Sequence, residues 1–344
     1  MRLVGTFRRL FIGLTLISLF LLVAFAFRLQ KWGGTLHKLN SAQVIEFSRG
    51  MQLTELAEIL ASRDIVKSKL GFVAYTRFFS DYSKLQAGSY RFVGNVSPDS
   101  VIRDLRNGKI YTPSILDLRI PEGFNIRQII KRMSANKLGS VKDLTRLTRD
   151  KNFIKSLGVK APSLEGYLYP ATYSYTRMPT ARVVFSQMVR TFFRRMPAGY
   201  EKSAREKKLS LHQAVTFASL IELETMIEDE RTKIAEVIWS RIKRGEPIGI
   251  DAALIYGIKN YKGDIKWKHL KDKSNRYNTR IYKGLPPGPI CSPTAASMAA
   301  VLKPTNQGYY YYVLVLDGKN RHHFSTTLKE HNKYVQMLKD KSKR

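Results

Sequence analysis

One glutamate stands where a charge is unusual, on the apolar side of a predicted helix. Ser210 and Gln213 form a capping-box pattern, which places the start of that helix. At about 100° per residue, Glu222 shares an arc of roughly 120° with mainly apolar residues. The arc consists of Leu211, Ala214, Val215, Ala218, Ile221, Glu222 and Thr225. Leu220 and Leu223 lie on the other side, so we expect most faces of this helix to be covered.

A carboxyl group in such surroundings suits acid–base chemistry. Desolvation penalises the charged form and raises the pKa, so the group can hold a proton near neutral pH. It can then deliver that proton to a leaving group as a general acid. The alternative is a buried salt bridge from Glu222 to Arg231 or Arg241 in the next predicted helix. Glu224 points away from the arc and is expected to be a surface or supporting group.

The elements around Glu222 predict an α+β domain that begins near residue 116. We expect helices at about residues 181–195, 210–226 and 228–244, preceded by an aromatic, turn-rich segment. A strand from Tyr309 to Leu316 turns at Asp317-Gly318 into a partner strand through Phe324, which is typical of a hairpin. Helices mixed with short, non-alternating strands are typical of the α+β class.

A smaller unit is predicted upstream, at residues 42–115. Its order is strand (Val44–Phe47), helix (from Leu53), helix (Lys67–Phe79) and strand (Gly88–Val93). The spacing of Phe47, Gly50, Leu53 and Leu56 returns in Ile120, Gly123, Ile126 and Ile129, so each copy reads as a strand, a glycine turn and a helix start. The first unit resembles a LysM-like module, a small fold that other proteins use to hold glycan chains.

The first 31 residues predict a membrane anchor. From Leu10 to Phe27 there are 18 residues without a charge, which as a helix cover roughly 27 Å, close to the hydrocarbon thickness of a bilayer. Arg2, Arg8 and Arg9 precede this run, so the N-terminus is predicted to stay cytoplasmic and the rest to be exported. No small-residue cleavage site follows, which favours an uncleaved anchor over a signal peptide. A polar linker is expected at residues 31–42.

The charge indicates a polyanionic partner. The chain has 59 Lys and Arg against 27 Asp and Glu, a net charge of +32, and nine of the basic residues lie between Lys259 and Lys283. Nucleic acid, anionic lipid and an acidic envelope polymer all attract such a chain, but export argues against nucleic acid. The single cysteine, Cys291, allows no internal disulfide, which fits a bacterial periplasm or wall space.

Several blocks of the sequence, in order, resemble the MltG/YceG family of endolytic murein transglycosylases. The resemblance covers essentially the whole chain, and one block, Ala218 to Thr225, contains Glu222. The other blocks are Ile120–Gly123, Leu164–Tyr173, Glu230-Arg231, Ser240–Ile242, Ile250–Gly257, Arg276–Thr279, Gly284–Ile290 and His323–Asn332. The family's catalytic acid falls on Glu222. Leu223 replaces the lysine that usually follows it, and Asp251 is kept among changed neighbours.

The resemblance implies cleavage of the β-1,4 bond between N-acetylmuramic acid and N-acetylglucosamine within nascent peptidoglycan strands. Glu222 would protonate the glycosidic oxygen and then accept a proton from the muramyl 6-hydroxyl, which closes a 1,6-anhydro ring without water. Hydrolases usually need two carboxylates, and no second acid shares the Glu222 face of the helix. The resemblance implies that no cofactor is needed. It also implies that the protein works beside peptidoglycan synthases, where a cut within a strand would terminate its elongation.

Other residues in these blocks suit a sugar-binding cleft. Tyr167, Tyr169, Tyr256 and Tyr277 can pack against sugar rings, although a core position explains each equally well. Asn278, Thr279 and Ser325 can meet N-acetyl or hydroxyl groups. Glu165, Glu224 and Asp251 can position Glu222 or substrate, or can serve only as caps and ion-pair partners. The loop Gly284–Ile290 is predicted to form a rigid cleft edge. His322 and His323 lack zinc-site spacing, so no metal is expected.

Two other interpretations remain open. A non-catalytic wall-binding or scaffold protein would use the LysM-like unit and the basic surface. A cytoplasmic cofactor-dependent lyase would need most of the chain inside the cell, together with a cofactor-linking lysine or a phosphate loop, and the sequence shows neither. The preferred interpretation is a cytoplasmic-membrane protein with residues 1–31 as the anchor, residues 42–115 as the LysM-like module and residues 116–340 as an extracytoplasmic YceG-type catalytic domain.

Overall fold

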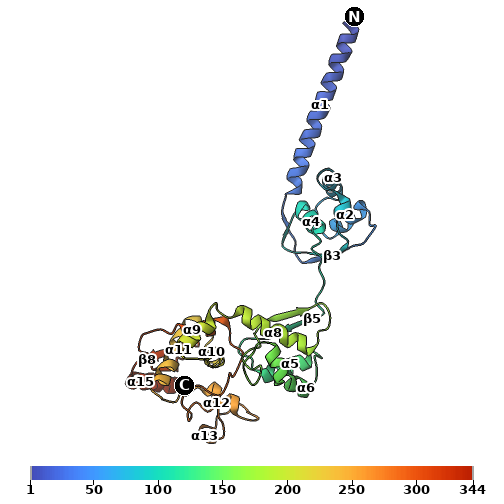
Figure 1. Ribbon diagram of the computed structural model, residues 1–344. Coiled ribbons are helices and arrows are strands. Elements are labelled where there is room, and N and C mark those ends of the chain that lie inside the picture. Colours follow the sequence, from blue (N-terminus) through green and yellow to red (C-terminus); the bar gives the residue numbers. More distant parts are fainter. Residues whose placement is uncertain (1, 343–344) are drawn as a thin grey trace. The chain divides into compact units, whose positions relative to one another are not determined.

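The chain folds into two compact units, the first ending at Pro113 and the second beginning at Ser114 (Figure 1). The computed structural model describes residues 2–342, and side chains are described from residue 12 to residue 341. Tyr111 still belongs to the first unit, because its N–H donates to the Ser89 carbonyl at 2.6 Å. Ile115 already belongs to the second, because its N–H donates to the Tyr175 carbonyl at 2.8 Å.

The first unit is a two-stranded antiparallel sheet covered by helices. Its elements are α1 (Arg2–Gly33), β1 (His37–Lys38), β2 (Gln43–Phe47), α2 (Leu53–Ser62), α3 (Lys69–Phe79), the 3₁₀ turn η1 (Tyr82–Lys84), β3 (Gly88–Phe92), β4 (Asn95–Val96) and α4 (Pro98–Arg106). Strands β2 and β3 pair antiparallel from Gln43↔Phe92 to Phe47↔Gly88. Ile45 and Tyr90 point inward from this sheet and are buried with Leu56 of α2. The elements therefore follow the predicted strand–helix–helix–strand order.

Helix α1 is long and apolar enough to cross a membrane over Ile12–Gly33, and its large apolar side chains from Ile12 to Phe27 are exposed, whereas Leu29 is buried in the first unit. The predicted linker at residues 31–42 is not a free tether. The helix continues to Gly33, where the Tyr75 ring fills the space a side chain would need. Strand β1 then pairs with β4 through His37↔Val96. Packing and strand pairing thus fix most of a segment whose polarity predicted a linker. Arg2, Arg8 and Arg9, which predict orientation, lie outside the described side chains.

The second unit is built around one buried helix, α10. Its elements are β5 (Leu116–Arg119), α5 (Ile126–Ala135), α6 (Val141–Leu147), α7 (Lys151–Ser156), β6 (Thr172–Tyr175), α8 (Ala181–Arg195), α9 (Tyr200–Glu206), α10 (Leu211–Glu224), α11 (Glu228–Lys243), α12 (Asp251–Gly257), α13 (Trp267–Leu270), α14 (Ala295–Leu302), β7 (Tyr311–Leu314), β8 (His322–Ser325) and α15 (Leu328–Ser342). Helices α9, α11, α12 and α14 contact α10. Every residue of α10 from Ala214 to Glu222 is buried. This agrees with the prediction from the apolar residues on both sides of the helix that most of its faces are covered.

Helix α10 ends at Glu224, two residues before the predicted end. Thr225 has extended backbone angles, with φ −150° and ψ 144°. Its hydroxyl accepts the Ile227 N–H and donates to the Glu230 carboxylate, so the side chain stabilises a turn between α10 and α11. A threonine hydroxyl that bonds to nearby backbone competes with the helical ladder in this way.

A buried carboxylate, Glu236 of α11, fixes the chain leading into the β7–β8 hairpin. Its Oε1 accepts the backbone N–H groups of Gln307, Gly308 and Tyr309, at 2.6 to 3.2 Å. Its Oε2 accepts the Thr305 hydroxyl. Strands β7 and β8 then pair antiparallel from Tyr311↔Ser325 to Leu314↔His322, which confirms the predicted hairpin.

Replacing Glu236 by alanine should lower the free energy of unfolding by about 3 kcal/mol, because several buried N–H groups lose their acceptor. Denaturant unfolding of the detergent-solubilised chain measures this. Glu201→Ala is the matched control, since Glu201 makes only an exposed ion pair with Arg205 and its loss should change stability by less than about 1 kcal/mol. Equal effects of the two substitutions would contradict the role given to Glu236.

Candidate active site

Glu222 lies near the C-terminal end of α10, with its side chain 7% exposed. Its Oε2 accepts two hydrogen bonds from Thr294, one from the backbone N–H at 2.9 Å and one from the hydroxyl at 2.8 Å. Its Oε1 has no hydrogen-bond partner among residues 12–341. One carboxylate oxygen is therefore held in place while the other stays available.

Thr294 can hold Glu222 because it is the N-cap of α14. Its side-chain oxygen also accepts the Ser297 N–H at 3.5 Å, as expected for a threonine at the N-cap of a helix. The N-terminal end of a helix carries partial positive charge, which favours a carboxylate. The position of the Glu222 carboxylate is thus set by the start of α14.

The segment from Pro287 to Thr294 lies along α10. The Ile290 N–H donates to the Ser219 hydroxyl at 3.1 Å, and the Cys291 thiol donates to the Ser219 carbonyl at 3.4 Å. Pro289 packs against Gly166, whose φ of +85° and lack of a side chain permit the close approach. The loop Gly284–Ile290 was expected to form a cleft edge, but none of its residues lines the cavity at Glu222. Its contacts instead position Thr294.

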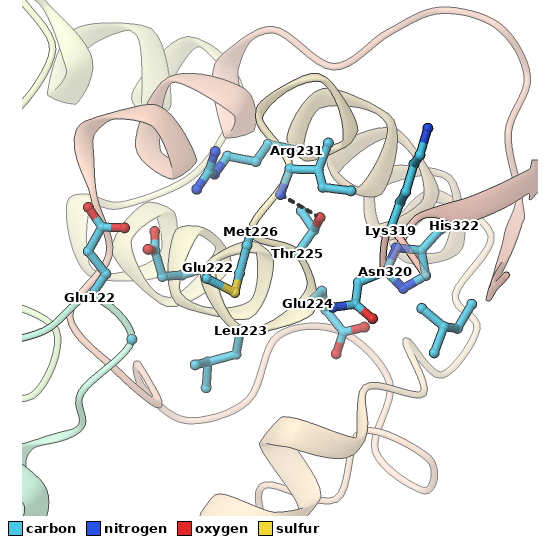
Figure 2. Close-up of a pocket in the computed structure, with 13 residues that line it drawn as sticks. Glu122, Glu222, Leu223, Glu224, Thr225, Met226, Arg231, Lys319, Asn320 and His322 are labelled. Carbon is cyan, nitrogen blue, oxygen red and sulfur yellow. Dashed lines mark hydrogen bonds between the residues drawn. The ribbon is translucent and has the colours of Figure 1, made fainter. Parts of the chain in front are cut away.

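Glu222 borders a cavity of about 690 Å³ (Figure 2). The walls come from the loop before α5, the end of α10, the following turn, α11 and the β7–β8 hairpin. The lining residues are Glu122, Gly123, Glu222, Leu223, Glu224, Thr225, Met226, Ile227, Arg231, Leu314, Lys319, Asn320 and His322. Figure 2 shows the Glu122 and Glu222 side chains on one side of the cavity and Lys319, Asn320 and His322 on the other. Segments far apart in the sequence therefore assemble this mixed polar and apolar cavity.

The salt-bridge alternative for Glu222 is not realised in the part of the chain that the structure describes. No ion pair joins Glu222 to Arg231 or Arg241 there. Arg231 lines the same cavity and donates from Nε to the Ser297 hydroxyl at 3.2 Å. The Arg241 guanidinium donates instead to the Ile248 carbonyl at 3.0 Å and the Tyr310 carbonyl at 3.3 Å.

Glu224 is not a surface group that points away from the site. It lines the same cavity as Glu222, and its Oε2 accepts the Tyr312 hydroxyl at 2.7 Å. Burial raises the pKa of Glu224, against the hydrogen bond from Tyr312. The helix ends directly after Glu224, and the β7–β8 hairpin covers that end. The helical wheel places Glu224 away from the apolar arc but carries no information about this hairpin.

Another buried carboxylate, Glu230 of α11, connects the turn after α10 to the β7–β8 hairpin. Its Oε1 accepts the His322 N–H at 2.7 Å, and its Oε2 lies 2.8 Å from His322 Nδ1. The Thr225 hydroxyl also donates to Oε2, at 2.9 Å. His322, which sequence patterns left without a role, thus helps to build the cavity wall.

Glu165 lies in a separate cluster at the start of α5. The Ile126 N–H points between its two oxygens, at 3.0 and 3.1 Å, and the Tyr256 hydroxyl donates to Oε2 at 2.8 Å. Burial raises the pKa of Glu165 to about 7, although both donors oppose this. The Tyr256 ring packs on Tyr277 with centroids 4.8 Å apart. None of these three predicted site residues lines the cavity at Glu222.

The remaining predicted residues occupy supporting positions. The Asn278 amide donates to the Leu270 carbonyl at 3.1 Å, and the Thr279 hydroxyl donates to the Ile250 carbonyl at 3.0 Å and accepts its N–H. Asp251 accepts the Arg280 Nε–H at 2.7 Å. Three predicted residues belong to or border the core: Tyr167, Tyr169 and Ser325. Of the predicted set, the cavity contains Glu222 and Glu224.

Sequence reasoning gave no site role to Thr294, Glu122 or Lys319. Thr294 carries a local signal, because a Thr before Ala-Ala-Ser is a typical N-cap. The other two come from a turn before α5 and from the tip of the β7–β8 hairpin. Nothing in local periodicity shows that these turns meet at the end of α10.

Fold and site together define a mixed helix-and-sheet protein with a carboxylate-containing cleft. The chain belongs to the YceG-like family, whose model matches residues 45–337. It is 29% identical over 306 residues to the endolytic murein transglycosylase of Bacillus subtilis (strain 168), covering 84% of this chain and 82% of that one. It is 25% identical over 314 residues to the endolytic murein transglycosylase of Streptococcus pneumoniae serotype 2 (strain D39 / NCTC 7466), and spans 56% of that protein's length.

A solved relative has the same fold. The 2.6 Å crystal structure of the putative yceG-like protein lmo1499 from Listeria monocytogenes superposes with a TM-score of 0.57 and 27% sequence identity. The match covers 85% of this chain and 99% of that one. The predicted family resemblance is therefore confirmed.

The raised pKa of Glu165 predicts a pH dependence of stability. Between about pH 4.5 and pH 7 the folded state keeps a proton that the unfolded state has released, so rising pH destabilises the folded state over this window. Glu165→Gln lacks this contribution. Its free energy of unfolding relative to the unsubstituted protein should rise by about 3 kcal/mol between pH 4.5 and pH 8. Parallel urea titrations measure the difference, and a difference that stays constant with pH would refute the assignment.

Proposed function

We propose that this protein is a membrane-anchored lytic transglycosylase that cuts within peptidoglycan glycan strands. The observation that carries the proposal is Glu222: a buried carboxylate with one oxygen held by Thr294 and the other facing a 690 Å³ cavity. Family membership supports the same reaction, since relatives in this family are named endolytic murein transglycosylases.

In the proposed reaction Glu222 serves first as acid and then as base. It protonates the oxygen of the β-1,4 bond between N-acetylmuramic acid and N-acetylglucosamine, and the bond from that oxygen to muramyl C1 breaks. The muramyl 6-hydroxyl oxygen bonds to C1, and its proton passes to Glu222. The products are a 1,6-anhydro-muramyl end and a free 4-hydroxyl on N-acetylglucosamine. Glu222 regains the proton that it gave, and no water, metal or cofactor enters the balance.

The cavity also raises hydrolysis as a second candidate reaction. Glu122, Glu222 and Glu224 all line it, and glycoside hydrolysis usually uses two carboxyl groups. Glu122 is exposed to solvent, whereas Glu224 is partly buried and accepts a hydrogen bond from the Tyr312 hydroxyl. In the preferred proposal Glu224 binds substrate or positions Glu222, and a hydrolase would instead use it to activate water. The two reactions give different ends, anhydro or reducing, so the products distinguish them.

The other predicted residues act at a distance from the reacting bond in this proposal. Glu165, Tyr256 and Tyr277 form one cluster that fixes the start of α5 beside the Glu122 turn. Asp251, Asn278 and Thr279 stabilise the loops around α12. Tyr167, Tyr169 and Ser325 support the helices and the hairpin that carry the cavity. Each then contributes to glycan binding through the wall that it supports.

The first unit adds a location and a glycan contact. Its β2–α2–α3–β3 order supports a LysM-like role in holding glycan chains. The length and apolarity of helix α1 support a single-pass anchor in the cytoplasmic membrane. The arginines before it favour a cytoplasmic N-terminus, which would place the cleft on the extracytoplasmic side. Cleavage there would act on strands as they emerge and terminate their elongation, beside a peptidoglycan synthase. The net charge of +32 favours attraction to anionic lipid or wall polymer.

Glu222→Gln should lower the yield of 1,6-anhydro ends by at least about 100-fold, because amide cannot transfer the proton. Full-length protein in detergent is incubated with uncrosslinked glycan strands, and the ends are counted by mass spectrometry. Glu228→Gln, an exposed residue at the start of α11, should leave the yield unchanged. Equal yields from Glu222→Gln and the unsubstituted protein would exclude the catalytic assignment. Products heavier by one water would identify a hydrolase.

Thr294→Val should lower the yield of anhydro ends by about tenfold or more, because the Glu222 carboxylate loses its hydroxyl donor and its fixed position. Thr294→Ser keeps that donor and should retain most of the activity. The assay is the one used for Glu222, with thermal unfolding recorded for both variants. If valine and serine perform alike in equally stable proteins, the positioning role of Thr294 is wrong.

A further inference from the structure

The last turns of α1 pack antiparallel against α3. Trp32 meets Tyr75 with ring centroids 6.3 Å apart, and further up α1 Phe25 meets Phe78 at 6.0 Å. Trp32 also covers Gly71, where a side chain would not fit. Going along α3 from Gly71 to Phe78 therefore means going back along α1 from Trp32 to Phe25, as the adjacent α1 and α3 in Figure 1 illustrate.

This pairing fixes the depth of the α3 tip relative to the apolar run of α1. The charge-free run Leu10–Phe27 covers roughly 27 Å, and the hydrocarbon layer of a bilayer is about 30 Å thick. The run is no longer than the layer, so an anchor of this length places all of its residues inside. Phe25 lies two residues, about 3 Å, inside the end of the run. A ring in contact with Phe25 then lies at the same depth.

The side chains at this tip are those that a membrane boundary favours. Phe78 is 55% exposed and Phe79 is 41% exposed, although both rings are large and apolar. Arg77 is exposed beside them and has no ion-pair partner among the described residues. Arg28 and Trp32 lie lower on α1, where the polar headgroups begin. Basic and aromatic residues at this level are typical of the membrane interface.

We propose that the C-terminal tip of α3 inserts into the outer edge of the bilayer, with Phe78 and Phe79 among the acyl chains and Arg77 at the lipid phosphates. The first unit is then docked on the membrane in one orientation rather than suspended from it. The occupant of the exposed aromatic face is lipid, because the face is continuous with the lipid-exposed surface of α1. This inference rests on α1 being the anchor and is independent of the reaction at Glu222.

Depth-dependent fluorescence quenching tests the proposal in the full-length chain. Cys291→Ala removes the only cysteine, and single cysteines are then introduced by Phe79→Cys or, in a separate protein, Phe78→Cys. Each is labelled with an environment-sensitive dye and reconstituted into nanodiscs, one chain per disc, made of phosphatidylglycerol and phosphatidylethanolamine with or without doxyl-labelled lipid. Doxyl lipid should quench the dye at either position by about twofold or more and its emission should be blue-shifted.

Two matched positions calibrate the measurement. Leu16→Cys reports from the exposed apolar surface of α1 and should be strongly quenched. Val93→Cys replaces an equally exposed apolar residue of the same unit, at the turn after β3. This turn is bonded to Leu39, which follows α1 and β1 in the chain, so it lies farther from the membrane than the end of α1. A dye at position 93 should not be quenched. If the dye at position 78 or 79 is as little quenched as the dye at position 93, while the dye at position 16 is strongly quenched, the proposal is wrong. A blue shift without doxyl quenching would also overturn it, because a protein contact would then cover the face. Strand-cleaving activity decides neither outcome.

Discussion

The contact between Glu222 and Thr294 is the constraint on which the site depends. A carboxylate buried at the end of α10 is tolerated because the first residue before α14 donates two hydrogen bonds to one of its oxygens. Thr294 reaches this place because Ser219 holds the preceding segment against α10. The buried helix, the Pro/Gly segment and the short helix α14 thus act together to present a single oxygen to the cavity.

The buried glutamates of the second unit divide by how their oxygens are used. Glu236 and Glu230 accept backbone N–H groups with both oxygens engaged, so they join segments that would otherwise leave buried donors unpaired. Glu165 does the same at the start of α5. Glu222 and Glu224 differ, because each has one oxygen without a hydrogen-bond partner among the described residues and both line the cavity. Burial alone therefore does not separate these two carboxylates from Glu236, Glu230 and Glu165; the oxygen without a hydrogen-bond partner does.

Local signals predict much of the fold. The capping box at Ser210, the apolar arc of α10 and the turn before β8 each depend on neighbours in the sequence, and each is present in the structure. The prediction of a free linker after the apolar helix was wrong, because distant contacts rather than local signals fix that segment. Its polarity is local, but α1 extends into this segment as far as Gly33, where Tyr75 packs, and β1 pairs with a strand almost sixty residues away. Composition does not report on such distant partners.

The sequence by itself determined that Glu222 would be the one charge on the apolar arc of a buried helix, that a long apolar helix lies near the N-terminus and that the chain belongs with the YceG-like proteins. Those features are written in helical periodicity, in an uninterrupted apolar run and in the order of motifs. Only the tertiary structure decided that Thr294 holds Glu222, that Glu224 shares its cavity and that Glu165 and Tyr256 lie elsewhere. Periodicity fixes the direction of a side chain around its own helix. What that side chain meets depends on where other segments pack, and hydrogen bonds across more than seventy residues decide that.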